Sequence, residues 1–165
     1  MKMTKEELAA KLEAHAKWLK TRYTDHVEGE RADLTCVDLT GADLTCADLT
    51  RANLMDADLT GADLTDANLT RADLTRADLT GADLTRADLT RADLTGADLT
   101  RADLTRADLT RADLTGADLT DANLEHVLRA STLVWDAISA TLSARMALKK
   151  THVEWEHNTD DGNKD

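Results

Sequence analysis

The sequence predicts an all-β solenoid, in which one chain winds a thin coil around a buried axis. Leucine recurs at every fifth position from Leu34 to Leu124, which makes nineteen consecutive pentads. Alanine precedes each leucine by two residues, except at Val37, and Asp or Asn always stands between them. A period of five matches neither the 3.6-residue turn of an α-helix nor the two-residue alternation of a strand.

The pentad Ala-Asp-Leu-Thr-x predicts a short extended piece followed by a bend. Alanine and leucine lie two apart, so they share one side of the extended piece. A bend after each pair brings the next pair to the same side, and bends in one direction make a coil. The chain has no Phe, which agrees with a core too narrow for large side chains. The expected core includes Leu34, Leu54, Leu74, Leu94, Leu114, Ala72 and Ala92.

The variable fifth position predicts how many pentads make one coil. Arginine recurs there every twenty residues, and so does glycine at Gly41, Gly61 and Gly81. Twenty residues are four pentads, so nineteen pentads make about 4.75 turns of a four-sided coil stacked at sheet spacing. In Arg-Ala-Asp the Arg and the Asp lie two apart and can share a side, and Arg51 stands in the same way beside Asn53. The expected outward charged ladder is interpreted as a solvated face and comprises Arg51, Arg71, Arg91, Arg111, Asp73, Asp93 and Asp113.

The Asp column is expected to serve the bends. Carboxylates stacked along one face repel one another. Asx side chains commonly accept hydrogen bonds from nearby backbone N–H groups in turns. The sequence therefore predicts that each Asp or Asn of the pentads stabilises its own bend.

Residues 1–30 are predicted to form an N-terminal helical cap and a link. Thr4 and Glu7 have the spacing of a capping box. Apolar residues then follow at helical spacing, which predicts a helix over about 5–22. His15 lies on the apolar side of this helix, so it is interpreted as a packed residue of the cap and not as a catalytic base.

Residues 125–150 are predicted to form a C-terminal helix that ends near Lys150. Ser131 or Thr132 could begin it, although Leu128, Leu133 and Ile138 also fit degenerate pentads. The helix either covers its own end of the rod or pairs with a second copy, and the sequence does not choose. Its expected apolar stripe is Val134, Ile138, Leu142 and Met146. Residues 151–165 are polar and are expected to be a disordered tail.

Composition narrows the function classes. The net charge of −12 argues against nucleic acid and anionic membranes as partners. No apolar run reaches the length of a membrane span and no signal peptide opens the chain, so a cytoplasmic location is expected.

Cys36 and Cys46 are two pentads apart, on opposite faces of one turn, which predicts free thiols. No catalytic, cofactor or metal motif is present, so we expect no enzyme, no cofactor and no metal.

Residues 32–124 resemble the pentapeptide-repeat family, whose motif is Ala-(Asp/Asn)-Leu-x-x in tandem. The resemblance implies a right-handed quadrilateral β-helix with Leu and Ala inside. The repeat is more regular than expected of natural members, since residues 71–120 use only Arg, Gly, Ala, Asp, Leu and Thr. This regularity favours a consensus-engineered or artificially extended member of the family.

The expected function is that of a non-enzymatic structural or interaction scaffold without a dedicated activity. The resemblance implies an alternative, because some family members are similar in shape and charge to duplex DNA and inhibit DNA gyrase as dimers. Residues 31–124 hold 19 Asp and 9 Arg, which makes the rod acidic. The arginine ladder and the absence of a loop within the repeat argue against this alternative.

Overall fold

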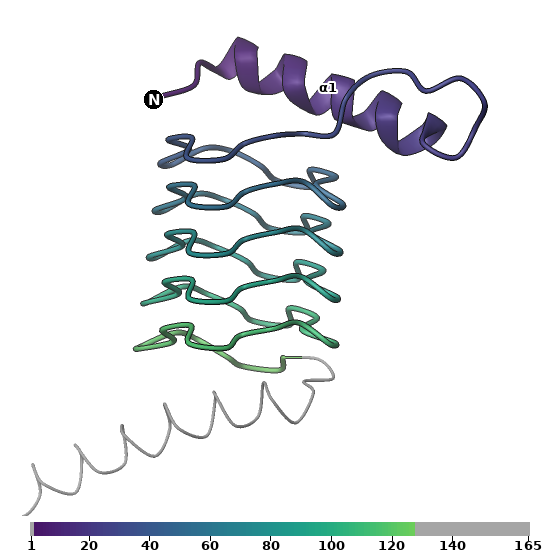
Figure 1. Cartoon of the computed structure of the whole chain (residues 1–165). Helices are drawn as coiled ribbons and strands as arrows, with labels where there is room; N and C mark the ends of the chain where they lie inside the picture. Colours follow the sequence, from purple (N-terminus) through teal and green to yellow (C-terminus); the bar gives the residue numbers. More distant parts are fainter. Residues whose placement is uncertain (1, 128–165) are drawn as a thin grey trace, which may run out of the picture.

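The computed structural model describes residues 2–127, which form one helix and a stack of coils. Helix α1 (Lys5–Thr21) lies across one end of the stack, and the chain winds away from it coil by coil (Figure 1). No described helix has the length and apolar character needed to cross a membrane.

The coils are held together by isolated parallel bridges between residues twenty apart. The first joins Asp33 to Asn53 and the last joins Asp103 to Asn123. Each pentad supplies one bridging residue, at its Asp or Asn position, so four pentads separate bonded neighbours. The extended piece is too short for continuous strands, because two of the five residues are in a turn. The coil is thus a β-solenoid made of single bridges.

Each pentad also donates backbone hydrogen bonds to the neighbouring coils. The pentad around Leu74 is representative: the Leu74 N–H donates to the Asp93 carbonyl at 2.7 Å and the Asp78 N–H to the Ala57 carbonyl at 2.9 Å. The turn itself is closed by the Ala77 N–H, which donates to the Leu74 carbonyl at 3.0 Å. Backbone hydrogen bonds therefore link each pentad to the coils on both sides and close its own turn.

The fifth residue of each pentad forms the corner of the turn and has a positive φ. It is the third residue of a four-residue turn, the position where type II turns favour glycine. Glycine occupies some corners, such as Gly61 at φ +62°, but fourteen non-glycine residues of the described chain also have positive φ. Arg76 is typical, at φ +56°.

The core is a column of leucine and alanine inside the coil. Leu34, Leu54, Leu74 and Leu94 have no exposed surface, and Leu114 is 2% exposed. Ala72 and Ala92 are 1% exposed. The column continues into α1, since Leu8 belongs to the same buried cluster while Met3 and Leu12 pack against it.

Helix α1 begins with a capping box. The Thr4 hydroxyl oxygen accepts from the Glu7 N–H at 3.2 Å, and the Thr4 N–H donates to the Glu7 carboxylate at 2.8 Å. Just before it, Lys2 bridges to Asp38, so the chain start adds to the edge of the first coil. The helix expected over about 5–22 thus spans Lys5–Thr21 and lies on the rod.

At the far end, the turn pattern continues to the last described residues. The Arg106 N–H donates to the Glu125 carbonyl at 2.9 Å, and the Val127 N–H donates to the Leu124 carbonyl at 3.4 Å. The expected helix with Val134, Ile138, Leu142 and Met146 lies outside the described residues, and so does the expected tail 151–165.

Candidate functional site

The acidic columns on the coil stabilise its turns. At pentad after pentad, the Asp Oδ1 accepts from the N–H of the Thr two residues on, as when Thr80 donates to Asp78 at 2.9 Å. Asparagine does the same, since the Met55 N–H donates to Asn53 Oδ1 at 3.2 Å. Some threonine hydroxyls add a second bond, as from Thr115 to Asp113 at 2.6 Å. One oxygen of these carboxylates is therefore committed to the fold.

Two of these carboxylates near the far end of the coil show how the threonine hydrogen bonds affect their charge. Donation from the Thr115 hydroxyl and N–H lowers the pKa of Asp113, and Thr120 lowers the pKa of Asp118 in the same way. A hydrogen bond stabilises the charged form that accepts it. Asp113 and Asp118 are therefore held in the charged form and are not candidates for general acids at neutral pH.

Two arginines of the coil form ion pairs, and both pairs join stacked coils. Arg76 donates to Asp56 through Nε and one terminal nitrogen, each at 2.7 Å. Arg86 makes the same two-bond contact with Asp66. In each pair the two partners are twenty residues apart in the sequence. Among the described residues, no ion pair joins an Arg of the coil to the Asp two residues on, so that pairing stays a prediction.

The charged ladder of the sequence analysis separates into two parts in the structure. Asp73, Asp93 and Asp113 bind threonine N–H groups in their turns, at 2.9–3.0 Å. The arginines of the ladder remain as a column of their own, which we call the arginine column: Arg51, Arg71, Arg91 and Arg111. Among the described residues, no carboxylate forms an ion pair with any of these four guanidinium groups.

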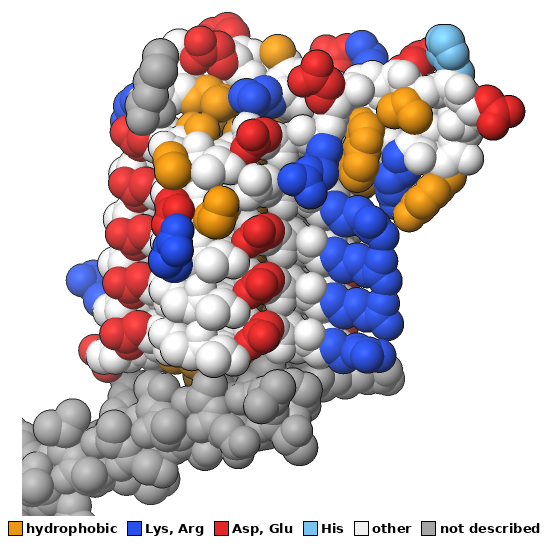
Figure 2. Space-filling view, viewed as in Figure 1, with side chains coloured by type: hydrophobic (Ala, Val, Ile, Leu, Met, Phe, Trp, Pro, Cys, Tyr) orange, Lys and Arg blue, Asp and Glu red, His pale blue; other side chains and the backbone are white. Residues whose placement is uncertain are grey.

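The arginine column lines a shallow groove of about 490 Å³. A column of threonines, Thr50, Thr70, Thr90 and Thr110, lines it as well. Figure 2 shows basic side chains running down the coil beside columns of acidic ones. Arg71, Arg91 and Arg111 are exposed, and Arg51 is half-buried.

Arg22 and Tyr23, which follow α1, complete the groove at its N-terminal end. The Arg22 guanidinium lies 4.9 Å from the centre of the Tyr23 ring, whose residue is 78% exposed. A hydrogen bond from Arg22 and the charge of Arg51 lower the pKa of Tyr23. Sequence analysis missed both residues, because they lie outside the repeat and only the course of the chain after α1 brings them to the groove.

His15 is buried between α1 and the coil. Its Nδ1 accepts from the Ala32 N–H at 3.0 Å, and its ring stacks on Trp18 with centroids 5.6 Å apart. Burial lowers the pKa of His15 below its ordinary value. With no exposed surface, the imidazole holds the helix to the rod and offers no contact to a substrate.

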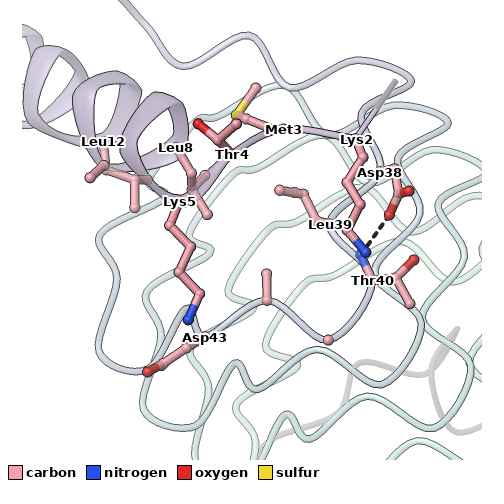
Figure 3. A pocket seen from close by; sticks show the side chains of 13 residues that line it. Lys2, Met3, Thr4, Lys5, Leu8, Leu12, Asp38, Leu39, Thr40 and Asp43 are labelled. Atoms are coloured by element: carbon pink, nitrogen blue, oxygen red, sulfur yellow. Dashed lines mark hydrogen bonds between the residues drawn. The ribbon is translucent and has the colours of Figure 1, made fainter.

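A second groove, of about 450 Å³, lies between α1 and the first coil. Figure 3 shows Leu8 and Leu12 pointing from α1 toward the coil, and Lys5 extending toward Asp43. Its apolar floor continues the core, so the groove is the seam along which the helix docks.

Metal ligands do not gather within residues 2–127: no three His, Cys, Asp or Glu side chains there could hold one ion. Cys36 and Cys46 are free, exposed thiols at two corners of positive φ. They are ten residues apart, which is half a coil.

Comparison with known proteins identifies the repeat. The pattern of the pentapeptide repeats matches in eight copies, over residues 32–71, 52–91 and 87–125. A pentapeptide repeat protein from the cyanobacterium Cyanothece is 38% identical, with a TM-score of 0.53 over 54% of this chain and 60% of that one. This chain thus spans about three fifths of that relative. No curated protein sequence matches.

Two further solved structures are similar to parts of the chain. A pentapeptide repeat protein from the Arabidopsis thaliana thylakoid lumen is 38% identical, with a TM-score of 0.45 over 58% of this chain and 70% of that one. QnrB1, a plasmid-mediated fluoroquinolone resistance protein, is 20% identical, with a TM-score of 0.39 over 58% of this chain and 64% of that one.

Proposed function

The chain belongs to the pentapeptide-repeat family, and from this premise we propose that it is a non-enzymatic scaffold whose outward faces carry its interactions. Proteins of this family are generally structural repeat proteins without enzymatic activity. For this chain the proposal adds that binding, where it occurs, uses the side chains at the corners and along the columns of the coil.

The observation that carries the proposal is how the repeat divides its side chains. Leucine and alanine are buried in the core, and the Asp or Asn side chain of each pentad accepts a hydrogen bond from a backbone N–H of its own turn. Catalysis needs a reactive group within hydrogen-bond reach of a base or a stabilising donor in an enclosed site. Within the described residues, the side chains left over are corner residues and threonines, and these face solvent.

The proposal includes the finer features of the fold and of its origin. It describes a right-handed, four-sided coil of about 4.75 turns, which the bridges between residues twenty apart support. It places helical segments at both ends, supported at the N-terminal end by α1. It also describes an engineered consensus repeat, supported by residues 71–120, which use only six residue types. It places the protein in the cytoplasm, supported by the free thiols of Cys36 and Cys46.

A turnover screen tests the non-enzymatic proposal. The full chain is incubated with chromogenic phosphate, carboxylic and glycosidic esters, and product release is compared with buffer alone. We expect no turnover above buffer. Turnover that Asp93→Asn abolishes, while the melting temperature stays the same, would overturn the proposal, because that change keeps the turn acceptor and removes only the charge.

A second candidate function is that of a DNA-mimicking inhibitor of DNA gyrase. The favouring observation is the set of acidic columns, in which bridged Asp residues repeat along the rod at about 4.7–4.9 Å. The arginine column interrupts this negative surface on one side. A homodimer through residues 125–150 belongs to this candidate and is tested by light scattering on a chain truncated near residue 130.

A supercoiling assay with DNA gyrase separates the two candidates. Leu74→Asp is the matched control, because a charge buried without a partner unfolds the coil while the acidic composition is retained. Inhibition at low micromolar concentration by the chain, absent with Leu74→Asp, would establish gyrase as the partner. Equal weak effects of both proteins, or none, favour the scaffold.

A further inference from the structure

We propose that the arginine column is a binding surface for a linear condensed phosphate, inorganic polyphosphate. The inference rests on the proposed function, because it assigns a ligand to one outward face of the scaffold. It concerns Arg51, Arg71, Arg91 and Arg111 together with Arg22 at the N-terminal end of the groove.

Within residues 2–127, no carboxylate forms an ion pair with the cations of the column. Its members are twenty residues apart, so their backbones stack at about 4.7–4.9 Å, the spacing of bonded strands. Arg76 and Arg86, on other sides of the coil, lie one coil from Asp56 and Asp66 and bind them. In the arginine column the residue one coil away is another arginine, and no described carboxylate neutralises it.

Such a row favours a bound anion. Like charges at this spacing repel one another, and an anion along the row would relieve the repulsion. The planar guanidinium presents a fork of N–H donors that matches phosphate oxygens. The hydroxyls of Thr70 and Thr90 lie in the same groove and have no hydrogen-bond partner among the described residues, so they add donors.

The surroundings select a thin ligand. Asp73, Asp93 and Asp113 stand two residues from the column, and the chain carries a net charge of −12. A wide polyanion such as duplex DNA would meet these acidic columns, whereas a single linear chain would contact the cations alone.

The spacing and the lining favour phosphate over other linear anions. Acidic side chains on one face of an extended peptide repeat at about 6.6–6.8 Å, so they lose register with the column within two or three residues. Single-stranded nucleic acid gains much of its affinity from bases stacked on aromatic rings. The groove offers one aromatic ring, Tyr23, at its end. A condensed phosphate carries a negative charge on every phosphate unit, and its flexible backbone can adjust to the spacing of the arginine column.

The test measures binding of linear polyphosphate to the full chain by calorimetry at low salt. Arg71→Gly/Arg91→Gly removes the two central cations, and glycine suits the positive φ of both corners. Arg86→Gly/Arg106→Gly is the matched control, with the same charge change on another side. We expect the first variant to lose about tenfold or more in affinity and the control to lose less than about threefold. Equal losses in both variants would overturn the proposal, because they would report net charge only.

A second variant keeps the net charge constant. Deletion of residues 76–80 removes one Arg and one Asp and shifts every later corner by one side of the coil. Arg91 and Arg111 then no longer lie below Arg71. We expect the same loss of affinity as for Arg71→Gly/Arg91→Gly, and unchanged affinity would contradict the column as the site.

Two further measurements belong to the test: the binding of competing linear anions, and the hydrolysis of polyphosphate. Oligothymidylate or poly-glutamate binding as tightly as polyphosphate would overturn the assignment, and so would no detectable polyphosphate binding at millimolar concentration. The length of the polyphosphate and the amount of released phosphate are measured after incubation. Shortening of the polyphosphate would overturn the non-enzymatic proposal while leaving the binding surface in place. Absence of binding would overturn the surface and leave the scaffold.

Discussion

The corner residue of each pentad stands in the left-handed region of the backbone map, where an L-amino acid costs about 1–2 kcal/mol. Fourteen described corners and turns carry this cost, and glycine relieves it at others, including Gly41, Gly61 and Gly81. The buried leucines outweigh it, since each contributes about 2 kcal/mol before entropy. The corner is therefore the position where composition tunes stability without touching the core.

Two glycines in different surroundings, Gly61 at a corner and Gly29 in the link after α1, give the first prediction. A Cβ at Gly61 would meet no atom within 4 Å, so Gly61→Ala should cost about 1 kcal/mol through φ alone. A Cβ at Gly29 would lie 2.1 Å from the Ala14 carbonyl oxygen, so Gly29→Ala should cost more, about 1–3 kcal/mol, and loosen the link from α1. Urea denaturation measures both. Equal costs would show that the link does not pack as described.

The acidic residue of the pentad gives the second prediction. Asp83 Oδ1 accepts from the Thr85 N–H at 2.9 Å, and Asp83 is bridged to Asp63 and Asp103. Asp83→Ala should cost about 0.5–1.5 kcal/mol, because the turn loses its acceptor. Asp83→Asn keeps the acceptor and removes a like charge, so its melting temperature should equal or exceed that of the parent chain. A cost for Asn as large as for Ala would mean that the charge, and not the bond, holds the turn.

At the scale of the element, local signals were predictable and contacts between elements were not. Thr4 and Glu7 marked the start of α1, and the twenty-residue recurrence of arginine placed the arginine column on one side of the coil. The ion pair of Arg76 with Asp56 follows from the same recurrence, but reasoning within the pentad missed it. The approach of Gly29 to Ala14 and of Tyr23 to the arginine column depends on how α1 packs, which no local pattern encodes.

The docking of α1 should depend on pH through His15. Burial lowers the pKa of this imidazole in the folded chain, so the unfolded chain binds more protons between the two pKa values. Stability of the docked helix is therefore complete above the unfolded value of about 6.5 and decreases as the pH falls below it.

Hydrogen exchange of the α1 amides at pH 7 and pH 5, corrected for the intrinsic rate, measures this dependence. We expect weaker protection at pH 5. His15→Gln is the control, because an amide oxygen could accept from the Ala32 N–H and does not titrate in this range. Protection that is independent of pH in the parent chain would contradict the buried, neutral imidazole.

At the scale of the whole molecule, stability should be a sum over stacked coils. Leu74 lies in the middle of the stack with no exposed surface, whereas Leu124 near the far end is only partly buried. Leu74→Ala should cost about 2–5 kcal/mol, the range for a core leucine whose cavity cannot close, and Leu124→Ala should cost less. Denaturant titration of both variants checks the difference. Equal costs would place the two leucines in equivalent surroundings and contradict the inward column.

The account depends most on one geometric claim, that residues twenty apart are stacked neighbours whereas residues ten apart lie half a coil from each other. Excimer fluorescence of pyrene-labelled cysteines tests it. In the parent chain the label attaches to Cys36 and Cys46, both exposed. In a variant with Cys46→Ser and Asp56→Cys, the two labelled positions are twenty apart. The account predicts strong excimer emission from the variant and none from the parent chain; excimer emission from the parent chain and none from the variant would contradict it.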